Sequence, residues 1–125
     1  MALQVRLLYC QRGEGAVSDE RCPVAAAAKL LGDKWTLIVL RDLAGGPRRF
    51  TELERSGAGI SPSILAARLR ELEEQGIVTR TCYPEIPPRV EYTLTQKGRA
   101  ALPVVEALRT YGTRWLLPIS AQARP

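Results

Sequence analysis

Between positions 23 and 55, hydrophobic residues recur at helical spacing and are interrupted by glycine and proline. Pro23 suits the first position of a helix, where its missing N–H costs no hydrogen bond, and Gly32-Asp33 ends that run. A second apolar stripe stops at Gly45-Gly46-Pro47, and a short helix is expected over about 50–55. The pattern therefore predicts three consecutive helices. The apolar stripe of the second helix consists of Trp35, Ile38, Val39 and Leu43.

A fourth helix has the strongest signals in the chain. Ser61 is a good N-cap, Pro62 occupies the first helical position, and Gly76 suits the C-terminal stop. Leucines recur at i, i+4 and i+7, so one side should be buried and the opposite side polar. The leucines are Leu65, Leu69 and Leu72, and the polar side contains Ser63, Ala67, Arg70 and Glu74.

After Gly76 the hydrophobic period changes from helical to alternating. Residues 77–82 and 89–94 are predicted to form two strands. The proline-rich segment 83–88 between them cannot donate regularly to a ladder, so it is predicted to be a stiff loop. Thr95 is then expected to cap a last, long helix.

The composition limits the classes of function. The chain has 125 residues, 46% of them hydrophobic, and a net charge of +5, so it can form one core and suits a phosphate-bearing partner. It contains no histidine, which removes the commonest general base and metal ligand. The sequence offers no nucleophile–base pair, metal-ligand constellation or phosphate-binding loop. We therefore expect no enzymatic activity, no metal and no cofactor.

The ends of the chain suggest neither export nor membrane insertion. Gln4 and Arg6 interrupt the apolar residues of 1–8, and no stretch approaches the roughly 20 apolar residues of a membrane span. Three cysteines without a C-x-x-C pair favour a reducing compartment. We expect a cytoplasmic protein without membrane attachment. Its expected parts are an arm over 1–21, one folded domain over 22–117, and a tail over 118–125.

The order of the predicted elements is that of a winged helix-turn-helix. In that fold a short helix crosses the DNA backbone, and the next helix presents its N-terminal half to the major groove. A hairpin, the wing, lies beside them and reaches a neighbouring backbone or minor groove. The predicted fold is therefore α+β and mostly helical, a winged helix-turn-helix with a two-stranded wing and a C-terminal dimerisation helix.

A series of short motifs over about residues 22–117 makes the prediction more specific. They are Cys22-Pro23-Val24, Leu31-Gly32-Asp33-Lys34-Trp35-Thr36-Leu37, Gly46-Pro47-Arg48-Arg49-Phe50-Thr51-Glu52-Leu53, Gly59-Ile60-Ser61-Pro62, Leu69-Arg70-Glu71-Leu72-Glu73, Gly76-Ile77-Val78, the run from Tyr83 to Tyr92, and Leu94-Thr95 with Gly98. Together they resemble the HxlR family of bacterial regulators, which is similar to the wider MarR-type group. The resemblance implies a homodimeric transcription factor, expected to be a repressor, on a pseudo-palindromic operator.

The fourth helix is predicted to read bases in the major groove. Arginine can bind guanine bidentately, and serine can donate to or accept from either strand. The candidate residues are Ser61, Ser63, Ala67, Arg68 and Arg70. For the two arginines, the alternative is ordinary surface pairing with Glu71, Glu73 or Glu74.

Phosphate contacts are predicted for basic residues around this helix. Lys34 begins the second helix, Arg48 and Arg49 precede the short helix, and Arg89 lies in the wing. For each of them the alternative is a solvated surface charge. Glu85 argues against deep insertion of the wing, because a carboxylate facing phosphates is repelled.

Cys22 occupies the expected N-cap of the first helix, where the helix dipole favours a thiolate. Some HxlR-type regulators sense oxidants or electrophiles through a cysteine in this region. Two interpretations stay open: packing near an interface, which is slightly favoured, and redox sensing through a disulfide or adduct. Cys82 is interpreted as a packing residue of a strand, and Cys10 in the arm gives no prediction.

The last helix is predicted to join two copies of the chain. Members of the resembled family pair through their first and last helices. The apolar seam of the last helix is larger than so small a domain needs, which fits a covering partner. The expected interface residues are Val24, Leu31, Val104, Leu108, Tyr111 and Trp115.

The sequence thus predicts a homodimeric, sequence-specific regulator that binds double-stranded DNA. Whether an oxidant or a small molecule acts as effector stays open. The alternative is a winged-helix module that binds proteins and has lost DNA binding. Salt dependence separates the two, because DNA binding releases counterions and weakens steeply with salt.

Overall fold

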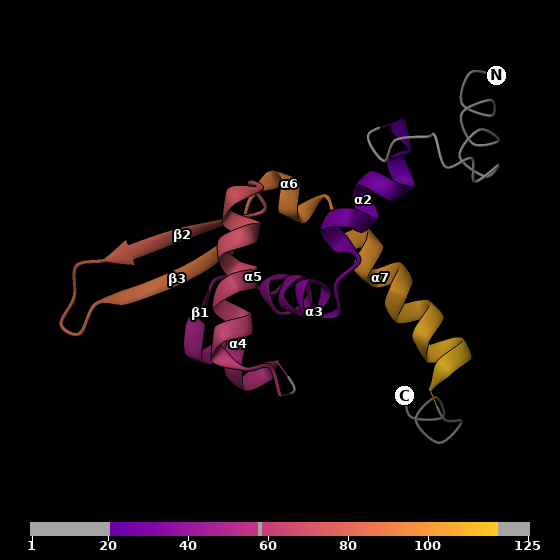
Figure 1. Ribbon diagram of the computed structural model, residues 1–125. Helices are drawn as coiled ribbons and strands as arrows, with labels where there is room; N and C mark the ends of the chain where they lie inside the picture. Colours follow the sequence, from indigo (N-terminus) through magenta and orange to yellow (C-terminus); the bar gives the residue numbers. More distant parts are fainter. Residues whose placement is uncertain (1–20, 58, 118–125) are drawn as a thin grey trace. The chain divides into compact units, whose positions relative to one another are not determined.

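A computed structural model describes residues 21–57 and 59–117 of the chain (Figure 1). Residues up to Lys34 and residues from Trp35 onward form two compact units, and each is described by itself. The first unit contains helix α2 (Pro23–Leu31). The second contains helix α3 (Lys34–Leu43) from Trp35 onward and the remaining elements. These are β1 (Arg48–Arg49), α4 (Phe50–Ser56), α5 (Pro62–Glu74), β2 (Val78–Tyr83), β3 (Arg89–Leu94), α6 (Gln96–Arg99), α7 (Leu102–Tyr111) and the π-helix η2 (Gly112–Leu116).

Helix α2 begins and ends where the sequence predicts. The Cys22 thiol is the N-cap and accepts a hydrogen bond from the backbone N–H of Ala25 at 3.4 Å. Pro23 follows at the first helical position. At the other end the N–H of Gly32 donates to the carbonyl of Ala28 at 2.7 Å, and a Cβ on Gly32 would lie 2.4 Å from that same oxygen.

Helices α3, α4 and α5 supply most of the core of the second unit. The predicted leucine side of α5 is buried, as are Val39 and Leu43 of α3. Thr36 and Leu40 complete the buried side of α3, whereas the predicted Trp35 and Ile38 are only half-buried. The largest fully buried side chains are Leu40, Leu43, Leu53, Leu65, Leu69, Leu72 and Ile77.

Polar contacts fix α3 to the end of α4. The carboxylate of Asp42 accepts from the hydroxyl of Ser56 and from the guanidinium of Arg41, which lies 2.9 Å away. Arg41 also donates to the backbone carbonyl of Ser56 at 3.2 Å. The position of the short helix α4 is therefore set by hydrogen bonds as well as by the burial of Leu53.

Helix α5 has well-formed caps at both ends. The Ser61 hydroxyl accepts from the N–H of Ile64 at 3.2 Å, as an N-cap serine should. At the C-terminus the N–H of Ile77 donates to Leu72 at 2.8 Å and the N–H of Gly76 donates to Glu73 at 3.1 Å. This is the Schellman arrangement, and Gly76 has the positive φ of 76° that it requires.

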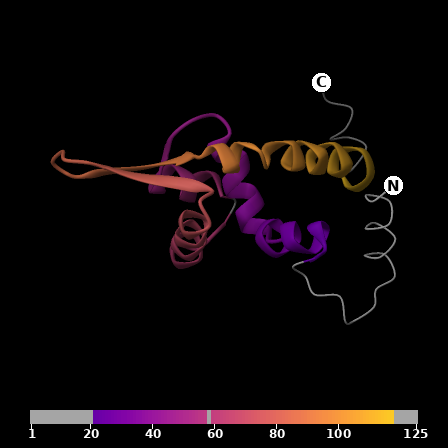
Figure 2. The same cartoon turned by 90° about the horizontal axis from the view of Figure 1, so that it is seen from above.

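The sheet is antiparallel and has the strand order β1-β3-β2. Strands β2 and β3 pair from Val78 with Leu94 to Tyr83 with Arg89, which confirms the predicted hairpin. This hairpin is the predicted two-stranded wing, and Arg48 and Arg49, for which no strand was predicted, pair with Tyr92 and Glu91 as a short third strand of the sheet. Two residues are too few for a visible alternating pattern. Figures 1 and 2 both show the hairpin projecting away from the helices of its unit.

The prediction of one long last helix beginning after Thr95 is wrong. Thr95 caps the short helix α6 by accepting from the N–H of Gly98 at 3.1 Å. The chain then turns at Ala100 and Ala101 before α7, which has a proline in its first turn. Proline cannot donate the hydrogen bond that an uninterrupted helix would need there.

A set of hydrogen bonds ties α6 to the C-terminal end of α5. The Thr95 hydroxyl lies within hydrogen-bond distance of the carbonyl oxygens of Gly76 and Ile77. The ammonium group of Lys97 donates to the carbonyl of Gln75 at 2.8 Å. No helix within the described ranges is both long and apolar enough to cross a membrane.

Candidate nucleic-acid interface

Helices α4 and α5 are joined by a turn that depends on glycine. The N–H of Gly57 donates to Glu54, and the N–H of Ile60 donates to Gly57 at 3.3 Å. A Cβ on Gly57 would lie only 2.5 Å from Cγ2 of Ile60, which is buried. Gly59 has a φ of 97°, a conformation that side chains disfavour. The turn therefore places α5 against α4 with Ile60 as its apolar contact.

The face of α5 opposite its leucines is open to solvent. Ser63 and Arg70 are exposed, and Ala67 and Arg68 are half-buried. Arg68 forms an ion pair with Glu71 at 3.5 Å, as the surface-pairing alternative expects. The guanidinium of Arg70, in contrast, has no ion-pair partner among the described residues.

The charge along α5 is distributed unevenly. Its last turns contain the three acids Glu71, Glu73 and Glu74, whereas its first half contains none. The N-terminal end also has the positive end of the helix dipole. Only the part of the helix before these acids, up to Arg70, therefore suits a polyanion. The Ser61 hydroxyl, 3.3 Å from that of Ser63, lies at the start of this part.

The basic residues predicted to contact phosphate have different surroundings. Arg49 is exposed, and its backbone N–H is held by the Glu52 carboxylate at 2.7 Å, so its guanidinium projects from a fixed point at the start of α4. Arg48 is half-buried and donates to the carbonyl of Pro47 at 2.9 Å. Lys34 is exposed at the first position of α3.

Arg89 is held by its own wing. Its guanidinium lies 2.8 Å from Glu85 and 3.2 Å from Glu91, and it stacks over the ring of Tyr83 at 4.1 Å. Its Nε is buried without a hydrogen-bond partner. Further down the hairpin, a hydrogen bond with Tyr92 raises the pKa of the exposed Arg80, which stays charged.

The two cysteines in the described part of the chain differ in exposure. Cys22 is half-buried at the N-cap of α2, the predicted position. Cys82 is exposed on β2, so its interpretation as a packing residue is wrong. Residues on one face of a hairpin that lacks a covering layer stay open to solvent. Cys10 lies outside the described residues.

The C-terminal helices expose the predicted apolar seam. Val104, Leu108, Tyr111 and Trp115 are 43 to 65% exposed, and Leu116 and Leu117 add to the same surface. In the other unit, Val24 is 71% exposed and Leu31 is half-buried. Exposed apolar area on this scale is typical of an interaction surface.

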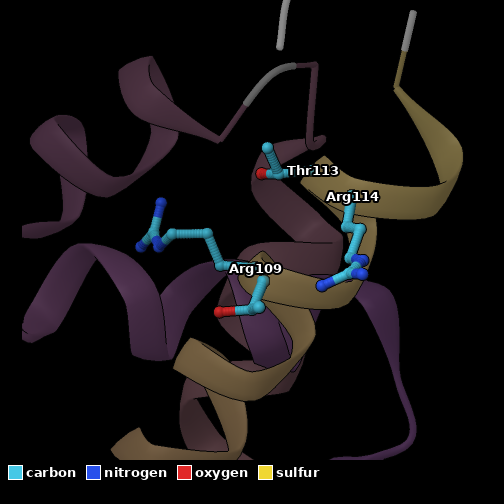
Figure 3. A pocket seen from close by; sticks show the side chains of 4 residues that line it. Arg109, Thr113 and Arg114 are labelled. Carbon is cyan, nitrogen blue, oxygen red and sulfur yellow. The ribbon is translucent and has the colours of Figure 1, made fainter. Parts of the chain in front are cut away.

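A shallow hollow of about 360 Å³ lies on the surface of α7 and η2. It is lined by Arg109, Thr110, Thr113 and Arg114, and Figure 3 shows the side chains of Arg109 and Arg114 extending in different directions, with their guanidinium groups apart. Arg109 already faces Glu106 at 3.3 Å, and Arg114 lies over the ring of Trp115. These charges do not converge on a common ligand position.

Sequence reasoning did not single out several residues that shape this surface. The hydrogen bonds from Thr95 and Lys97 to the end of α5 join residues about 20 positions apart, so no local sequence pattern indicates them. The strand formed by Arg48 and Arg49 and the clustering around Arg89 depend on strand register. Alternation and turn chemistry predicted the hairpin itself, but not the partners across it.

A short helix, a glycine turn, a second helix with one buried and one open face, and a hairpin next to it define a winged helix-turn-helix protein. An HxlR-like helix-turn-helix family model matches residues 30–120. The chain belongs to this family, whose members are transcriptional regulators.

Relatives and solved structures agree with this assignment. The uncharacterised HTH-type transcriptional regulator sll1512 of Synechocystis sp. is 47% identical over 95 residues, which cover 76% of this chain and 70% of the relative. A protein of Porphyromonas gingivalis W83, assigned to the MarR family of transcriptional regulators, has a TM-score of 0.76 at 37% identity and covers 80% of this chain and 98% of its own. The redox regulator HypR in its reduced form has a TM-score of 0.70 at 38% identity, with 74% and 91% coverage.

Proposed function

We propose that the protein is a homodimeric transcription regulator, acting as a repressor, that binds double-stranded DNA through the open face of α5 between Ser61 and Arg70. The observation that carries this proposal is the division of α5. Leu65, Leu69 and Leu72 anchor one side in the core, and the open side offers Ser63 and Arg70. A helix fixed in this way keeps its polar face rigid enough to read a groove.

Within this proposal the residues have different tasks. Arg70 reads a base, because no carboxylate among the described residues engages its guanidinium. Arg49, Arg48 and Lys34 contact phosphates and position the protein without reading sequence. Arg68 shares its charge with Glu71, so its contribution is smaller. Arg89 stabilises the wing more than it contacts phosphate.

Val24 and Leu31 of α2 are proposed as further interface residues, and the exposed seam of α7 and η2 supports the proposed homodimer. Covering this surface with a second copy would remove large apolar side chains from water. Two α5 helices related by a two-fold axis would then meet successive major grooves, so the binding site should be a pseudo-palindrome.

The proposal is tested by selecting binding sites from a random duplex library and measuring affinity by fluorescence anisotropy at several salt concentrations. If the dimer contacts six or more phosphates, affinity should fall roughly a thousandfold or more between about 50 and 200 mM salt. A protein-binding module with an apolar interface would show no such fall. Absence of binding to any duplex at low salt would refute the proposal.

Variants separate base reading from phosphate contact. Arg70→Ala should flatten the selected motif at one position in each half-site, a loss of discrimination of about 1–3 kcal/mol. Arg49→Ala should weaken all sequences alike and lower the salt slope by about one per protomer. Arg99→Ala, which removes an exposed charge on α6, is the matched control. An unchanged motif with Arg70→Ala removes that residue from base reading.

We propose further that Cys22 makes DNA binding responsive to oxidants. The thiol is the N-cap of α2 and accepts the Ala25 N–H, so a disulfide or an adduct would displace the cap. HypR, the similar structure, is itself described as a redox regulator. Diamide should change the DNA affinity of the wild type and of the controls Cys82→Ser and Cys10→Ser, but not of Cys22→Ser. Equal affinity of the wild type with and without diamide would leave Cys22 as a packing residue.

A further inference from the structure

The tip of the wing is apolar and fully open to solvent. The loop between β2 and β3 contains Pro84, Glu85, Ile86, Pro87 and Pro88, all of them exposed. Ile86 is 101% exposed, so no part of the described structure covers it. Figures 1 and 2 show that this loop is the far end of a hairpin that projects from the helices of the same unit.

The base of the loop is held in one arrangement by the cluster around Arg89. The arginine contacts Glu85 from the loop, Glu91 from its own strand and the ring of Tyr83 from the facing strand. The N–H of Glu85 also donates to the carbonyl of Tyr83 at 2.8 Å. The loop is therefore short, braced at its base and rich in proline, which limits its freedom.

The charges of the wing cancel, because Arg80 further down the hairpin balances the second glutamate of the cluster. From Val78 to Leu94 the chain has two arginines and two glutamates, hence no net charge. The carboxylate of Glu85, which would otherwise be repelled by phosphates, faces the guanidinium of Arg89. Attraction to phosphates is thus not what this tip supplies, and its remaining feature is an isoleucine among prolines.

We propose that Ile86 is an apolar wedge that enters the minor groove and partly unstacks one base step in each half-site. The inference rests on the proposed function, since it requires that α5 binds duplex DNA. Isoleucine and proline are side chains with which proteins open base steps from the minor groove. The hairpin that carries Ile86 begins beside α5, because β2 packs against α5 and β3 pairs with the strand of Arg48 and Arg49.

Insertion of Ile86 should add a DNA-sequence preference at a base step where the protein makes no hydrogen bond to a base. Pyrimidine–purine steps unstack most easily, so the step that receives Ile86 should be of this kind. The selected binding sites should therefore contain a pyrimidine–purine step at a fixed distance outside the bases read by Arg70. The Ile86→Ala protein should select sites without this preference and keep the motif read by α5.

The direct test uses duplexes selected by the wild type, with 2-aminopurine placed at that step. Wild-type protein should raise the 2-aminopurine fluorescence, which reports unstacking. Ile86→Ala should bind about tenfold more weakly, show no fluorescence rise and keep the salt slope of the wild type, because no phosphate contact is lost. Ile86→Leu should retain most of the affinity and the signal. Thr79→Ala, at an exposed position of β2, is the matched control.

The outcomes separate this inference from the function on which it rests. If Ile86→Ala matches the wild type in affinity and fluorescence while Arg70→Ala alters the motif, the wedge is refuted and DNA reading by α5 stands. A weaker Ile86→Ala with a reduced salt slope also refutes the wedge, since the tip then acts through phosphates. If no duplex binds the wild type, both proposals fall together. Because Ile86 has no contacts to lose, thermal melting of the variants should be unchanged.

Discussion

Two glycines of the C-terminal helices differ in the space around them. A Cβ on Gly98 would lie 2.3 Å from the carbonyl oxygen of Ile77 and 3.0 Å from Cδ2 of Leu94, whereas a Cβ on Gly112 would meet nothing within 4 Å. We expect Gly98→Ala to lower the free energy of unfolding by about 1–3 kcal/mol, the usual cost of overpacking. Gly112→Ala, at helical φ and ψ, should raise it by about 0.4–1 kcal/mol. Urea unfolding at one protein concentration measures both, and equal midpoints would contradict the predicted close contact at Gly98.

A second residue-scale prediction concerns the N-cap of α5. Ser61→Ala removes the acceptor for the N–H of Ile64 and should cost about 1 kcal/mol of stability. Ser63→Ala is the matched control, because Ser63 lies 3.3 Å from the Ser61 hydroxyl and does not cap the helix. Thermal or urea unfolding should separate the two variants. A control as unstable as Ser61→Ala would show that the hydroxyl pair, and not the cap, stabilises this end.

Residue roles were predictable where their chemistry is local. The caps Cys22, Ser61 and Thr95 follow from side chains that bond three residues ahead, and all three are found. The partners of Arg89 were not predictable, because they depend on which residues face each other across the hairpin. The exposure of Cys82 likewise depends on which face of the sheet a layer of helices covers.

At the scale of elements, substitutions on the two faces of α5 are expected to differ in their effect on stability. Leu69 is 1% exposed, so Leu69→Ala should destabilise the fold by about 2–5 kcal/mol. Arg70, the next residue, is exposed, and Arg70→Ala should leave stability within about 0.5 kcal/mol. Unfolding curves of the pair test this division. A large loss of stability in Arg70→Ala would mean that its effect on DNA binding reports folding instead of contact.

Elements with strong periodicity were predicted well, and elements made by tertiary contact were not. The buried leucines and Gly76 fix α5 from the sequence alone, and alternation fixes the hairpin. The two-residue strand β1 exists only because β3 lies next to it. The break between α6 and α7 combines the proline near the start of α7 with the close approach of Gly98 to Ile77, and only the first is visible in the sequence.

At the scale of the whole molecule, the exposed seam of α7 predicts association. Leu108→Glu places a charge in this seam and should convert a dimer into a monomer at micromolar concentration, because burying an unpaired carboxylate is costly. DNA affinity should fall about a hundredfold or more, since the two half-sites are then bound separately. Thr110→Glu, exposed on the same helix away from the seam, is the control. Sedimentation velocity that gives the same mass for both variants would place the interface elsewhere.

The amount of apolar surface on the last helices was predictable from residue types and spacing. What covers that surface was not, because shape complementarity between two surfaces arises from many weak contacts without a sequence pattern. The family resemblance supplied the expectation of pairing, and the exposure of Tyr111 and Trp115 agrees with it.

The ties from Thr95 and Lys97 to the end of α5 have a mechanical consequence. These two side chains lie at the start of the C-terminal helices and bond backbone carbonyls just after the last turn of α5. A tilt of α6 would therefore pull on the backbone of Gln75 and Gly76. If the protein pairs and binds DNA as proposed, a movement of the paired helices has a short, hydrogen-bonded route to the helix that contacts the groove.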